Sequence, residues 1–210
     1  MTLLRIDASI QGGRSASSEL ADLVLAEWSA ERPDEQVVRR HLGKDPLPAD
    51  AWATAITAAY VPADRRSEAE TAALALAAEI AGELRAADAV VLAFPLYNYG
   101  VSQHAKIWID LAVAGDTQGE RLLDGTPTVL LTTRGGAYGA GTPREGWDHN
   151  TAYLRRILAD AWGADLSVVE REFTLVGVNP ALDEFADLAA TMKRVAHENS
   201  TKAGKVLAAR

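Results

Sequence analysis

The 210-residue chain has 29 acidic and 21 basic side chains, a formal net charge of −8, and no cysteine. This acidic balance argues against a nucleic-acid partner, because phosphate backbones are bound through clustered Lys and Arg. Without cysteine, disulfides, thiolate catalysis and Cys-ligated metal or iron–sulfur centres are excluded, so any redox chemistry must come from a bound cofactor. No run approaches ~18 apolar residues and no leader pattern precedes the first strand. We therefore expect a cytoplasmic small-molecule enzyme with no membrane span, forming one domain over residues 1–210.

The first predicted elements are a short buried strand and a loop that suits a phosphate. Leu3, Leu4 and Ile6 form a short apolar run that stops at Asp7, and the residues that follow, up to 18, are mostly small or hydroxylated before a helical pattern begins. Such a strand, loop and helix N-terminus present N–H donors and hydroxyls at the positive end of a helix dipole. Neither a Walker A loop nor G-x-G-x-x-G is present, so we predict a hydroxyl-rich site for a phosphate ester. An ordinary serine cap on a surface turn is the alternative.

The rest of the chain alternates helices with strands, which predicts a parallel sheet wrapped by helices on both faces. Ligands bind such sheets at the carboxyl ends of the strands, which selects the loops 9–17, 95–100 and 134–141. In chain order, we predict a helix ending near residue 32, a weak edge strand over 36–41, a short helix over 51–60, a long helix over 68–86, a strand over 89–94, a helix over 102–114, a strand over 128–133, a glycine-rich loop over 134–146, a helix capped by Asp148, a strand over 165–173 and a closing helix over 182–207.

These three loops carry a family resemblance. Ser9 with Ser15-Ala16-Ser17, PLYNYG over residues 95–100 and TTRGG over residues 132–136 resemble the FMN-dependent NADH azoreductases. That family overlaps with the NAD(P)H:quinone oxidoreductases of the flavodoxin-like fold. The resemblance implies an α/β, flavodoxin-like, doubly wound five-stranded parallel sheet. It also implies FMN as cofactor, NADH or NADPH as electron donor, and a homodimer.

The resemblance further implies which residues hold FMN. Ser9, Ser15 and Ser17 would hold the phosphate. Arg134 is also open to pairing with a carboxylate of the fold, and either tyrosine of PLYNYG could simply pack against the sheet. We predict no catalytic side chain and no metal-ligand set, since the cofactor would carry the chemistry. The remaining implied cofactor-binding residues are Ala16, Pro95, Leu96, Tyr97, Asn98, Tyr99, Thr133, Arg134, Gly135 and Gly136.

Two functions follow as hypotheses. The first is transfer of two electrons from NAD(P)H to a quinone, an azo compound or a similar electrophilic acceptor by a ping-pong mechanism. The alternative is a flavodoxin-like electron carrier that docks onto protein partners, which the acidic charge would suit. The length of the chain and its wide loops favour a small-molecule pocket.

One segment departs from the family pattern. Residues 114–126 are shorter than expected and contain no aromatic residue, which predicts a less covered flavin, loose nicotinamide binding and access for polycyclic quinones. Most of the five tryptophans are expected in the core, with Trp52 and Trp108 as candidate dimer contacts. Lys106 and Asp110, four residues apart, are expected to form a surface ion pair.

Overall fold

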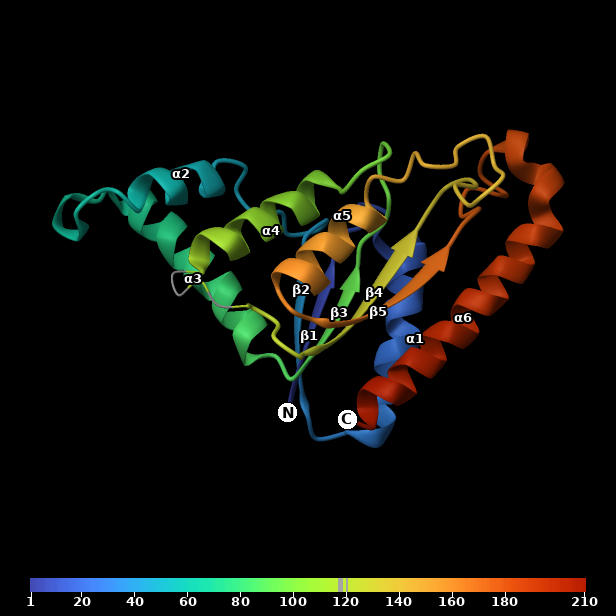
Figure 1. Cartoon of the computed structure of the whole chain (residues 1–210), viewed down its shortest axis with the longest axis horizontal. Coiled ribbons are helices and arrows are strands. Elements are labelled where there is room, and N and C mark those ends of the chain that lie inside the picture. Colours follow the sequence, from blue (N-terminus) through green and yellow to red (C-terminus); the bar gives the residue numbers. More distant parts are fainter. Residues whose placement is uncertain (117–118, 120) are drawn as a thin grey trace.

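The computed structural model describes residues 1–116, 119 and 121–210. Five strands form one parallel sheet in the order β2-β1-β3-β4-β5, which confirms the predicted flavodoxin-like architecture (Figure 1). The second strand lies at an edge of the sheet, as predicted. The strands are β1 (Thr2–Asp7), β2 (Gln36–His41), β3 (Ala89–Ala93), β4 (Pro127–Thr133) and β5 (Asp165–Arg171).

Helices cover both faces of this sheet. In Figure 1, α1 and α6 lie on one face and α3, α4 and α5 on the other, while α2 packs on the outside of α3 and α4. None of the described helices combines the length and apolar character needed to cross a membrane. The helices are α1 (Ala16–Glu31), α2 (Ala51–Ala58), α3 (Glu68–Ala86), α4 (Gln103–Gly115), α5 (Thr151–Arg155) and α6 (Ala186–Ala208).

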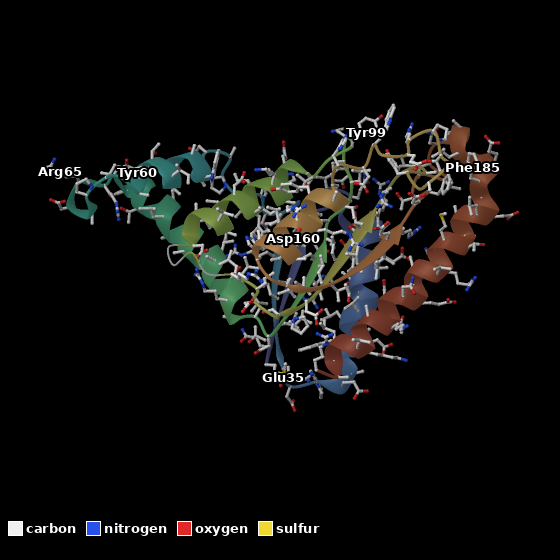
Figure 2. The ribbon with its side chains drawn as sticks, in the orientation of Figure 1. Glu35, Tyr60, Arg65, Tyr99, Asp160 and Phe185 are labelled. Atoms are coloured by element: carbon white, nitrogen blue, oxygen red, sulfur yellow. The ribbon has the colours of Figure 1, made fainter. Side chains whose placement is uncertain are left out.

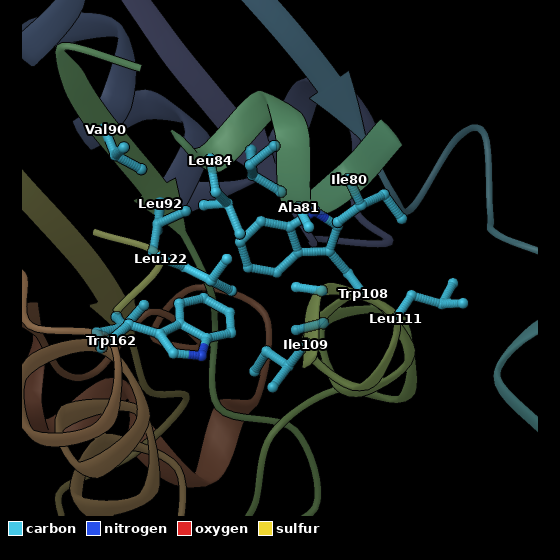
Figure 3. Close-up of a cluster of buried hydrophobic side chains, with 14 of the residues drawn as sticks. Ile80, Ala81, Leu84, Val90, Leu92, Trp108, Ile109, Leu111, Leu122 and Trp162 are labelled. Atoms are coloured by element: carbon cyan, nitrogen blue, oxygen red, sulfur yellow. The ribbon is translucent and has the colours of Figure 1, made fainter. Parts of the chain in front are cut away.

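Packing in the core explains why the central strands are uninterrupted apolar runs in the sequence. All five residues of β3 are buried, because helices press on it from both sides. Figure 3 shows Val90 and Leu92 of β3 facing Leu84 of α3 and Trp108 of α4. The Trp108 ring has no exposed surface and lies 5.8 Å from the Trp162 ring. The suggestion that Trp108 contacts a dimer partner is therefore wrong.

The short helix predicted over 51–60 ends at Ala58, and larger differences lie between β5 and α6. β5 ends at Arg171 rather than at residue 173, because Phe173 adopts a left-handed φ of 55° that turns the chain out of the sheet. A short 3₁₀ segment, Pro180–Phe185, then precedes α6, which starts at Ala186 rather than at residue 182. Both differences lie in the same connection, where local turn geometry overrides apolar periodicity.

The predicted cap of the fifth helix is borne out by its contacts. The Asp148 carboxylate accepts the N–H groups of Asn150 and Thr151 at 2.8 and 2.9 Å, although regular helix begins only at Thr151. The helix continues as a π-helix over Arg156–Ala161. Asp148 therefore fixes the start of α5, close to the carboxyl edge of the sheet.

The segment over residues 114–126 lies at the amino edge of the sheet, as far as it is described. Leu123 donates its N–H to the Trp162 carbonyl at 2.9 Å, and the Thr126 carbonyl accepts from the first residue of β5 at 3.0 Å. Residues 117, 118 and 120, on which part of the expectation falls, lie outside the described residues. The described part lies away from the predicted flavin loops, so its shortness does not open that site within one chain.

Candidate functional site

Three loops meet at the carboxyl edge of the sheet. The chain leaves β1 and β3 in opposite directions, toward β2 and β4, and parallel sheets commonly bind ligands where neighbouring strands diverge in this way. The Ser9 hydroxyl lies 3.1 Å from the Tyr97 hydroxyl, and the Leu96 N–H donates to the Thr133 carbonyl at 2.9 Å. Figure 2 shows Tyr99 at this edge, at the opposite end of the sheet from Glu35. The predicted site residues are therefore brought together.

The first loop ends in a hydroxyl-rich helix N-terminus. The Ser15 hydroxyl caps α1 by accepting the Ser18 N–H at 3.2 Å, and it lies 3.2 Å from the fully buried Ser17 hydroxyl. Within the described chain, the N–H groups of Ala16 and Ser17 have no acceptor, as expected for the first turn of a helix. These donors fit a phosphate ester. The serine cap and the predicted phosphate site therefore involve the same residues at the start of α1, and the presence of the cap does not exclude the site.

Tyr97 belongs to the same site. Its hydroxyl lies 3.2 Å from the Ile10 N–H, which donates to it, and the Gln11 N–H donates to the Ser9 hydroxyl at 3.2 Å. Tyr97 is half-buried and reaches across to the first loop. The alternative that this tyrosine merely packs against the sheet therefore does not describe its contacts.

The turn that carries the exposed residues of PLYNYG is strained. Tyr97 and Gly100 exchange two backbone hydrogen bonds of 3.1 and 2.9 Å, and both residues between them have left-handed φ angles, 48° for Asn98 and 67° for Tyr99. Non-glycine residues rarely take this conformation, and it concentrates at functional sites. The turn holds the Asn98 amide out toward solvent, where it could reach a ligand edge that both donates and accepts.

Arg134, included in the expected cofactor-binding set, has a side chain committed to the fold. Its guanidinium donates to Asp148 at 2.6 Å, to Glu170 at 2.8 Å and to the Thr151 hydroxyl at 3.1 Å, and it lies 3.3 Å from Glu172. The alternative of pairing with a carboxylate is thus what the structure contains. Its backbone is engaged as well, since the Arg134 N–H donates to the Arg171 carbonyl at 2.8 Å and its carbonyl accepts from the Thr174 N–H at 3.1 Å.

This network also sets the ionisation of Asp148. Burial by itself would raise the pKa of the Asp148 carboxyl, but hydrogen bonds from Thr151 and the charge of Arg134 outweigh burial and hold the pKa below its ordinary value. A carboxyl with a lowered pKa stabilises the folded chain at neutral pH and loses that contribution on acidification. The pairing therefore fastens the third loop to the start of α5 at neutral pH.

The two glycines after Arg134 meet other side chains of the chain. A Cβ added to Gly135 would lie 2.6 Å from the Leu175 side chain, and one added to Gly136 would lie 3.2 Å from the Arg144 guanidinium. The packing of Leu175 against position 135 therefore accounts for a glycine there, whether or not a ligand also approaches it. Thr133, which precedes this turn, is buried.

Three residues of this edge were not predicted. Tyr138 and Trp147 surround Tyr99, with ring centroids 6.4 and 5.4 Å from it. Asn150 is fully buried, and its amide donates to the Phe94 carbonyl at 3.4 Å and the Thr132 hydroxyl at 3.1 Å. Two aromatic residues in or beside a glycine-rich loop were a signal that could have identified the first two. Nothing in the sequence marked Asn150.

Gly43, also missed, lets the segment after β2 approach the first loop. A Cβ at this position would lie 2.1 Å from the Ser9 carbonyl oxygen. Replacing Gly43 with alanine should therefore displace Ser9, cost about 1–3 kcal/mol of stability and weaken FMN binding about tenfold or more. Titration of the apoprotein with FMN, followed by flavin fluorescence, measures the change.

Gly115 provides a matched control for this prediction. A Cβ there would lie 2.0 Å from the Ala77 carbonyl oxygen, a comparable clash at the far end of the 13-residue α4. Gly115→Ala should lose stability and keep its FMN affinity. Equal FMN affinities in the two variants would show that Gly43 has no special bearing on the site.

Comparisons with known proteins agree with this geometry. A family model described as "Flavodoxin-like fold" matches residues 1–195. A Frankia alni protein named FMN-dependent NADH:quinone oxidoreductase is 37% identical over 206 residues, covering 96% of this chain and 97% of its own. The chain belongs to the flavodoxin-like family that includes these FMN-dependent NADH:quinone oxidoreductases. A Streptomyces avermitilis member of the same name is 35% identical over 213 residues, covering 100% and 98%. The family resemblance inferred from the loop motifs is thereby confirmed.

A solved structure supports the fold independently. The azoreductase from Bacillus anthracis superposes with a TM-score of 0.77 at 22% identity, covering 98% of this chain and 99% of its own. A structural match at this level of sequence identity is evidence about the fold alone. The family therefore accounts for the chain along nearly its whole length, and the strand order and loop positions are those of a flavodoxin-like protein.

Proposed function

We propose that this chain is an FMN-dependent oxidoreductase that transfers two electrons from NADH or NADPH to a quinone, an azo compound or a similar electrophilic acceptor. The observation that carries the proposal is the junction of the first two loops at the carboxyl ends of β1 and β3. There, a hydroxyl-rich helix N-terminus and the Tyr97 hydroxyl lie together. Family members named for FMN, NADH and quinone support the same function.

The residues divide into those that bind and those that orient. Ser9, Ser15 and Ser17 would hold the FMN phosphate through their hydroxyls and the free N–H groups of the first turn of α1. The strained Tyr97–Gly100 turn would align the Asn98 amide with the edge of the ring. FMN, when bound, supplies hydride chemistry between the nicotinamide and the acceptor. The chain then needs to supply no acid, base or nucleophile of its own.

We propose that turnover is ping-pong, because nicotinamide and acceptor would use one opening beside Tyr99 and Trp147. Initial rates measured at several fixed quinone concentrations with varied NADH should give parallel double-reciprocal lines. This result requires that the two ligands bind in turn. Intersecting lines would mean that both fit at once, and the proposal of a shared opening would be withdrawn.

The electron-carrier alternative is favoured by one observation, the net charge of −8, which would suit docking onto a basic protein. The same kinetic experiment separates the two functions. An oxidoreductase turns over NADH and a small quinone with no second protein present, whereas a carrier requires its redox partner.

We further propose that residues 1–210 act as one FMN-binding domain and that two copies associate. Exposed Trp52, Ile56 and Tyr60 recur every four residues along α2 and the turn after it, and so lie on one side of a projecting arm (Figure 2). Such an apolar stripe suits a homodimer contact, which light scattering would report as twice the chain mass. We place the enzyme in the cytoplasm, where its reductant is regenerated.

A further inference from the structure

We propose that Arg144 and the aromatic residues beside it form a subsite for an anionic group carried by the electron acceptor. The ligand class is a planar aromatic acceptor bearing a sulfonate or carboxylate. This inference rests on the proposed function and adds a specificity-determining residue to it. Arg144 lies outside the first loop, which is expected to hold the phosphate.

The position of the guanidinium is the first observation. Arg144 Cζ lies 5.8 Å from the centroid of the Tyr138 ring, within the range of a cation–π contact. Its Nη1 atom would lie 3.2 Å from a Cβ added to Gly136. Arg144 is therefore held against the expected flavin glycines although its side chain is exposed.

The second observation is that this charge is not neutralised. Among the described residues, no carboxylate lies within ion-pair distance of Arg144. The adjacent Glu145 accepts the Gly141 N–H at 2.8 Å, and Glu172 is occupied by Arg134 and the Tyr138 N–H. By contrast, the guanidinium groups of Arg134 and Arg171 are paired with carboxylates.

The third observation is the aromatic surface next to this charge. Tyr99 and Trp147 are 42% and 49% exposed, and their rings pack edge to face at 5.4 Å. Tyr138 completes the cluster, 6.4 Å from Tyr99. A planar ring can stack against such half-exposed side chains while a substituent reaches the guanidinium.

Charge explains why the subsite would matter. The chain has a formal charge of −8, which repels an anionic acceptor at long range. A guanidinium binds two oxygens of a carboxylate or a sulfonate through parallel N–H···O hydrogen bonds, and such charge-assisted bonds are stronger than neutral ones. Arg144 is thus placed to favour anionic acceptors over neutral acceptors with the same ring.

The experiment compares Arg144→Gln with wild type on two acceptors that share one ring, 1,4-naphthoquinone and 1,4-naphthoquinone-2-sulfonate. Relative to wild type, kcat/KM for the sulfonate should fall about tenfold, the loss of roughly one charge-assisted hydrogen bond. The neutral quinone should change less than about twofold on the same principle. High salt should shrink the difference, because screening weakens exposed charge pairs. Arg156→Gln, which removes another exposed arginine, one paired with Asp160, is the control.

A binding measurement makes the result independent of turnover. Quenching of protein fluorescence should show that 2-naphthalenesulfonate binds the FMN-loaded wild type more tightly than uncharged 2-naphthalenemethanol, and that Arg144→Gln abolishes the difference. Equal losses of kcat/KM for both acceptors, or no loss for either, would overturn the assignment. So would a raised KM for NADH together with an unchanged ratio of kcat/KM for the sulfonate to kcat/KM for the neutral quinone. If the wild type reduces neither quinone, the proposed function fails, whereas the binding difference still tests Arg144.

Discussion

Replacing Arg134 with methionine should lower the free energy of unfolding by about 3–5 kcal/mol, because it leaves buried carboxylates without their counter-charge. The Asp148 and Glu172 side chains are only 12% and 11% exposed, so water could replace little of the positive charge and few of the hydrogen bonds that the guanidinium gives them. For a chain of this size the loss corresponds to a melting temperature lower by about 6–20 °C. Thermal and urea unfolding monitored by circular dichroism measure it.

The pH dependence of this effect separates ion pairing from lost packing. Since Arg134 helps to lower the pKa of Asp148, the stabilisation is complete at neutral pH and is lost as the pH falls below about 4. The gap between wild type and variant should therefore narrow on acidification. Arg156→Met, which removes an arginine 77% exposed, should cost less than about 0.5 kcal/mol at any pH. A gap that is constant with pH would contradict the ionic account.

The double substitution Ser15→Ala, Ser17→Ala should weaken FMN binding about a hundredfold or more. Each hydroxyl would donate to a phosphate dianion, and a hydrogen bond to a charged group contributes about 1.5–3 kcal/mol. Loss of the α1 cap should also cost about 1 kcal/mol of stability. FMN titration of the apoprotein gives the affinity, and unfolding of the same samples gives the stability.

Ser67→Ala is the matched control, because Ser67 caps α3 through a complete capping box with Glu70. It should lose similar stability and bind FMN as the wild type does. An unchanged FMN affinity in the double serine variant would refute the phosphate assignment, even if its stability fell.

The fold was predictable because its signals are periodic and local. Apolar runs such as that of β3 are buried on both sides, and Asp148 accepts the N–H groups that a cap should accept. The three loops were predictable because a parallel sheet places them at one edge. Neither inference required knowledge of contacts between distant side chains.

The parts that failed depend on such contacts. Trp108 is buried among residues distant in the sequence, including Leu84, Leu92 and Trp162, which sequence spacing does not reveal. The motif TTRGG implied a cofactor role for Arg134, with pairing to a carboxylate as the alternative, but it did not identify the partners Asp148, Glu170 and Glu172, which follow by 14 to 38 positions. The expectation for residues 114–126 came from the length of the segment and its lack of an aromatic residue, and neither feature says at which edge of the sheet a segment lies.

The most direct test of the account is anaerobic addition of NADH to the purified, FMN-loaded protein while the yellow flavin absorbance is recorded. The account predicts that NADH bleaches the absorbance and that a subsequent stoichiometric amount of a quinone restores it, with no other protein present. Protein that binds no FMN, or bound FMN that keeps its absorbance in excess NADH and NADPH, would contradict it.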